Sequence, residues 1–69
     1  MSEVHILVEE SVQIAWDFLE RSGEIINGYE TSQFLVSIVG RMALAGERRK
    51  LMLANRAIDF YRATRREAA

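Results

Sequence analysis

Apolar side chains recur every three or four residues in three stretches of the chain, the spacing that places them on one side of an α-helix. The first stretch covers about residues 2–22, and polar side chains occupy its opposite side. Ser2 is a suitable N-cap, and Gly23 can take the left-handed conformation that ends a helix. The β-branched alternation over residues 4–8 leaves a short strand open as an alternative there. The apolar stripe consists of Val4, Leu7, Val8, Val12, Ala15, Phe18 and Leu19.

The second and third stretches cover about residues 29–45 and 47–66. The second is apolar around more than half of its circumference. Asn27 followed three residues later by Glu30 resembles a capping box at its start, and Thr31 is a competing start. The third has a broad apolar side and a basic opposite side. The chain has no proline, and its breaks fall at glycines, so we predict one all-α domain of three helices over residues 1–69.

The pattern of the second stretch also predicts a partner. A helix that is apolar on most sides needs neighbours on most sides, and two further helices leave one side of it open. A chain of 69 residues is near the lower size at which one core outweighs chain entropy, and it has no cysteine for a disulfide. We therefore predict an antiparallel helical bundle that is completed by dimerisation.

The residues expected at the dimer interface are large apolar side chains of the second and third helices. They are Phe34, Leu35, Ile38, Val39, Met42, Leu51, Leu53, Ile58, Phe60 and Tyr61. The connection from Gly23 to Gly28 allows two arrangements. A closed connection gives two subunits side by side, whereas an extended one exchanges the first helix and gives an intertwined, domain-swapped dimer.

Charge is unevenly distributed, although the net charge is only −1. Residues 1–46 hold seven acidic residues against two arginines, and residues 47–69 hold seven basic residues against three acidic ones. The basic side of the third helix makes nucleic-acid binding the competing prediction. The acidic net charge and the absence of aromatic residues on that side count against it. The residues that would contact phosphates are Arg48, Arg49, Arg56, Arg62 and Arg66.

The sequence predicts no catalytic, cofactor-binding or metal-binding site. His5 is the only histidine and faces Glu9 one helical turn away, a spacing typical of a surface pair. The acidic residues of the first helix lie on its polar side and lack the inward Glu and His spacing of helical metal sites. Ser11 lies on the apolar stripe, and we expect its hydroxyl to donate to a carbonyl of the preceding turn. We predict a non-enzymatic chain without a cofactor.

The start of the chain has no basic leader, and this predicts a cytoplasmic protein. The most apolar run, residues 34–45, is twelve residues long and contains Arg41, whereas a membrane span needs roughly 20 apolar residues. We expect no membrane partner. The predicted function is a homodimeric protein–protein interaction or regulatory module, for which a further protein partner stays open.

Overall fold

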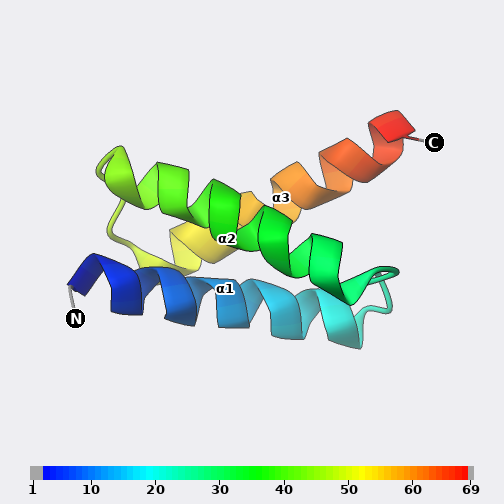
Figure 1. Cartoon of the computed structure of the whole chain (residues 1–69), viewed down its shortest axis with the longest axis horizontal. Helices are drawn as coiled ribbons and strands as arrows, with labels where there is room; N and C mark the ends of the chain where they lie inside the picture. The colour runs from blue at the N-terminus through cyan, green and yellow to red at the C-terminus, as the bar shows by residue number, and fades with distance from the viewer. Residues whose placement is uncertain (1–2, 69) are drawn as a thin grey trace.

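The computed structural model describes residues 3–68, which form three α-helices joined by two short connections. Helix α1 spans Glu3–Arg21, helix α2 spans Gly28–Leu44 and helix α3 spans Lys50–Ala68 (Figure 1). The predicted three-helix, all-α fold is confirmed, and the described residues contain no strand. The alternative of a strand at residues 4–8 is therefore wrong, because these residues form the first turns of α1. Ser2 lies outside the described residues.

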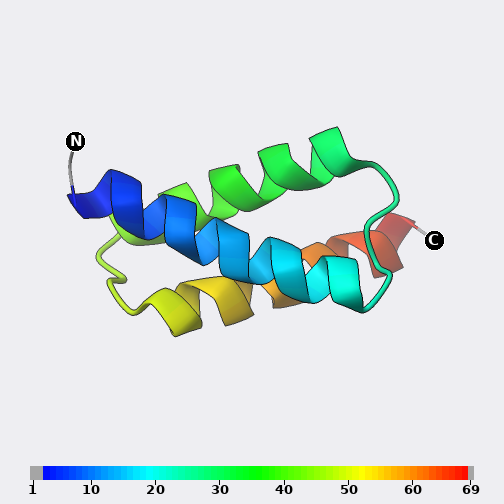
Figure 2. The same cartoon turned by 90° about the horizontal axis from the view of Figure 1, so that it is seen from below.

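The three helices are not equivalent in their packing. Helix α1 lies along both other helices, with α2 and α3 on either side of it (Figure 2). Helix α3 diverges from α2 toward the C-terminus (Figure 1). The side of the α2 and α3 pair that points away from α1 is covered by no helix among residues 3–68.

Local contacts fix the ends of the helices. The side chain of Asn27 accepts a hydrogen bond of 3.0 Å from the backbone N–H of Glu30, which confirms the predicted N-cap of α2. Gly23 has a φ of +71°, the left-handed conformation expected after α1. Helix α3 begins three residues later than predicted, because the carboxylate of Glu47 accepts the backbone N–H of Arg49 at 2.9 Å and holds residues 47–49 outside the helix.

The core consists of residues from all three helices, and three of them are alanines. Its members are Ala15, Leu19, Leu35, Val39, Leu53, Ala54, Ala57, Ile58 and Tyr61. Ser11 is fully buried beside this core, and its hydroxyl has no hydrogen-bond partner. The expected bond from Ser11 to the preceding turn is therefore wrong.

Candidate interaction surface

The ten residues predicted at a dimer interface fall into two groups in the structure. Five of them lie in the core of the subunit itself, where contacts within the chain already cover them: Leu35, Val39, Leu53, Ile58 and Tyr61. The other five keep part of their side chains in solvent: Phe34, Ile38, Met42, Leu51 and Phe60. The sequence does not separate these groups, because a core contact and an interface contact use the same residue types.

Four of the solvent-accessible residues lie along one groove between α2 and α3. Phe34 and Thr64 line a hollow at one end of this groove, and Met42 and Arg56 line a hollow at the other end. Ile38 is one turn from both Phe34 and Met42, and Phe60 is one turn from both Arg56 and Thr64, so these two lie between the hollows. We call Phe34, Ile38, Met42 and Phe60 the α2–α3 face.

Leu51 lies on the other side of α3. It shares its side of the helix with Ile58 and Arg62, seven and eleven residues further on. The guanidinium of Arg62 lies over the ring of Phe18 in α1, 5.1 Å from the ring centroid. Leu51 therefore faces the seam between α1 and α3 and is not part of the α2–α3 face.

The hollow next to Phe34 is the larger apolar depression of the groove, with a volume of about 510 Å³. Its floor is the edge-on pair of Phe34 and Tyr61, whose ring centroids are 6.0 Å apart. A buried hydrogen bond of 3.1 Å joins the hydroxyls of Thr31 and Tyr61 beneath it. Glu30 and Arg65 supply opposite charges at its rim. The remaining lining residues are Ile26, Asn27 and Thr64.

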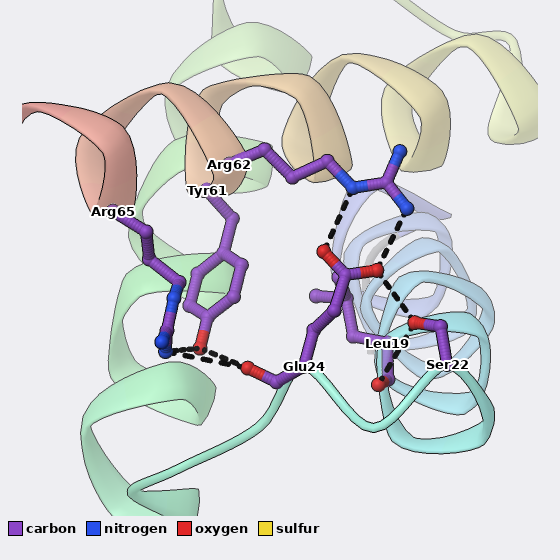
Figure 3. Close-up of polar contacts among 6 residues, drawn as sticks. All are labelled: Leu19, Ser22, Glu24, Tyr61, Arg62 and Arg65. Carbon is purple, nitrogen blue, oxygen red and sulfur yellow. Dashed lines mark hydrogen bonds and ion pairs between the residues drawn. The ribbon is translucent and has the colours of Figure 1, made fainter.

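The connection between α1 and α2 is tied to α3 by a set of hydrogen bonds on Glu24 (Figure 3). Arg62 donates to both carboxylate oxygens of Glu24, at 2.8 and 2.7 Å, and Ser22 donates to the same carboxylate at 2.6 Å. The backbone carbonyl of Glu24 accepts from Tyr61 at 3.2 Å and from Arg65 at 3.3 Å. These contacts hold the connection against α3.

The chain matches no protein-family model, no curated protein and no solved structure. We therefore infer the function of this surface from its own residues.

Three of the five arginines predicted to contact phosphates are engaged by other parts of the chain. Arg62 pairs with Glu24, and Arg49 pairs with Glu47 at 3.0 Å. The guanidinium of Arg48 donates to the backbone carbonyl of Ala43 at the end of α2 and to that of Glu47. The remaining two, Arg56 and Arg66, are exposed.

Helix α1 contains the single histidine of the chain, His5. His5 and Glu9 are 3.0 Å apart and exposed, which confirms the expected surface pair. Among the described side chains of residues 3–66, no group of three or more His, Cys, Asp or Glu residues could hold a metal ion. No helix in the same range is long and apolar enough to cross a membrane.

The ion pair on Glu24 makes the stability of the fold sensitive to acid. Hydrogen bonds from Arg62 and Ser22 lower the pKa of the Glu24 carboxyl from 4.5 to about 2. Because this pKa is lower in the folded chain, the ionised carboxylate stabilises the fold above pH 4.5, and that contribution is lost as the pH falls toward 2. We expect Glu24→Gln to lower the urea midpoint at pH 7 more than at pH 3, measured by circular dichroism.

Glu47→Gln is the matched control. Its carboxyl also has a pKa of about 2, but the hydrogen-bonding partner, Arg49, is only two residues away. A pair that close along the chain also forms in the unfolded state, so its loss changes the folding equilibrium less. Equal losses of urea midpoint at pH 7 and pH 3 in Glu24→Gln would contradict the role given to Glu24.

Proposed function

We propose that the chain is a non-enzymatic protein–protein interaction module that associates with a second copy of itself through the α2–α3 face. The exposed apolar surface of this face carries the proposal. Phe60 is 48% exposed, next to the half-buried Phe34, Ile38 and Met42. Two more apolar side chains lie at the ends of α2, Ile26 at 77% and Leu44 at 81% exposure. Covering such surface is favourable by about 25 cal/mol per Å².

The low charge of α2 also favours an interface. Glu30 and Arg41 are the only charged residues in this helix. Interface cores are depleted in charge and enriched in aromatic residues and methionine, and the α2–α3 face has two phenylalanines and a methionine. A two-fold dimer is the commonest oligomer, and it covers the same face on both subunits. The closed connection at Glu24 favours two subunits side by side over an exchange of α1.

Nucleic-acid binding is supported by fewer residues. A phosphate backbone needs several free cationic side chains in a row. Arg49 and Arg62 already bind carboxylates, and Arg48 binds backbone carbonyls. The exposed arginines Arg56 and Arg66 are ten positions apart and do not form a stripe by themselves.

The proposal is tested by placing a charge on the α2–α3 face. We expect Phe60→Glu to weaken self-association by about 2 kcal/mol, roughly 30-fold in Kd, because a carboxylate would be buried among apolar side chains. Light scattering after size-exclusion chromatography measures the mass, and circular dichroism checks that the helices remain.

Leu51→Glu is the matched control, since it places the same charge on the opposite side of α3, at a side chain that is 66% exposed. It is expected to keep the mass and the Kd of the unmodified chain. A Phe60→Glu chain that associates as tightly as the unmodified chain would refute the proposed interface.

A further inference from the structure

The charged and apolar residues on the exposed side of α2 are arranged so that two antiparallel copies of this helix complement each other. Measured from a centre midway between residues 35 and 36, Glu30 and Arg41 lie at equal distances on opposite sides. With a rise of about 1.5 Å per residue, each is about 8 Å from this centre along the helix axis. Leu44 lies at the C-terminal end of the helix, and Ile26 lies in the connection just before its N-terminal end. Reversal thus places an acid against a base and an apolar residue against another.

These residues also share one side of the helix. The spacing from Glu30 runs four, three, four and three residues, which keeps all five positions in a single stripe. Glu30 and Phe34 line the same hollow as Ile26, so the stripe borders the α2–α3 face. The stripe consists of Glu30, Phe34, Ser37, Arg41 and Leu44.

Both charged residues are available for a partner. Glu30 and Arg41 are exposed, and neither forms an ion pair with another of the described side chains of residues 3–66. Three other acidic side chains, Glu10, Glu24 and Glu47, pair with a lysine or an arginine of their own chain.

We infer that two copies of the chain pair α2 against α2 in antiparallel orientation, with the two-fold axis passing between residues 35 and 36. Glu30 of each subunit then faces Arg41 of the other, and Ile26 of each lies near Leu44 of the other. Phe34 packs near Ile38 of the partner, at the centre. This inference rests on the proposed self-association and adds its orientation and register.

Charge decides between the two possible orientations. In a parallel two-fold pair, equivalent residues face each other, so Glu30 would meet Glu30 and Arg41 would meet Arg41. Like charges placed together disfavour a wrong partner or register. The antiparallel pair converts both repulsive contacts into attractive ones.

Charge reversal at the two positions tests this arrangement. The E30R chain is positive at both positions, and the R41E chain is negative at both, so each is expected to self-associate at least tenfold more weakly than the unmodified chain. An equimolar mixture of the two is expected to form a heterodimer, because every contact then joins opposite charges. Sedimentation equilibrium measures the mass of each sample, and circular dichroism checks the helices.

The double variant E30R/R41E provides a second, independent arm. It exchanges the two charges within one chain and is expected to regain the homodimer, even though it carries both substitutions. If charge reversal acted by unfolding the chain, this variant would be the least stable of the three. A regained homodimer therefore shows that charge repulsion, and not unfolding, weakens association in the single variants.

Control variants separate the antiparallel pairing of α2 from the self-association itself. E20R on α1 and R66E on α3 reverse exposed charges away from the α2 stripe and are expected to associate like the unmodified chain. A dimeric unmodified chain whose E30R and R41E variants associate equally tightly would overturn the antiparallel pairing and leave the self-association standing. A mixture that stays monomeric would also overturn the pairing. An unmodified chain that is monomeric throughout would refute the proposed function itself.

Discussion

Replacing Leu35 by alanine is expected to lower the free energy of unfolding by about 2–5 kcal/mol. Leu35 is fully buried in the middle of α2, within the core shared by all three helices. Removing its side chain loses apolar burial and leaves a cavity that the surrounding side chains fill only partly. A domain of this size has a total stability of roughly 3–10 kcal/mol, so the variant should be partly or largely unfolded.

Urea denaturation followed by circular dichroism at one fixed protein concentration measures this loss, since association also changes apparent stability. Leu51→Ala is the control, because most of that side chain is in solvent, and it should change the stability by no more than about 0.5 kcal/mol. An unchanged urea midpoint in Leu35→Ala would show that α2 does not pack through this residue.

Replacing Tyr61 by phenylalanine is expected to have the second largest effect, about 1–3 kcal/mol. The buried Tyr61 hydroxyl donates to the carbonyl of Glu24 at 3.2 Å and accepts from Arg65 at 3.3 Å. Its single proton is used on that carbonyl, so the hydroxyl of Thr31 donates to it at 3.1 Å. Phenylalanine keeps the ring but leaves the nearly fully buried Thr31 hydroxyl without this partner.

The double variant Thr31→Val/Tyr61→Phe separates this cause from a loss of packing. Valine has nearly the shape of threonine without the hydroxyl, so the double variant should recover part of the lost stability. Tyr29→Phe is the control, since Tyr29 is exposed, and its urea midpoint should not move. Equal stabilities of Tyr61→Phe and the unmodified chain would contradict the role of this hydroxyl in closing the fold.

The helices could be predicted from the sequence because their apolar spacing is local information. Taken alone, the β-branched residues at 4–8 are also compatible with a strand. They form a helix because their apolar stripe continues along the rest of α1. Helix α3 starts later than predicted because the carboxylate of Glu47 binds Arg49. The spacing of apolar residues does not predict such a side-chain contact. Helix boundaries depend on such side-chain contacts more than helix existence does.

The tertiary polar contacts could not be predicted from the sequence. Arg62 binds a glutamate 38 residues earlier, and this pair forms only because the connection after α1 folds back against α3. On the helical wheel Arg62 looks like a member of a free basic side, equivalent to Arg56. The division of the apolar residues into core and surface likewise depends on tertiary packing, since Leu53 is fully buried whereas Phe60, seven residues further along α3, is 48% exposed.

The mass of the unmodified chain in solution tests the central claim most directly. One chain has a mass of 7.9 kDa, so sedimentation equilibrium over a range of micromolar concentrations is expected to give twice this value, about 16 kDa. Dilution should shift the mass toward that of one chain as a single two-state equilibrium. A mass of 7.9 kDa at every concentration would contradict self-association through the α2–α3 face.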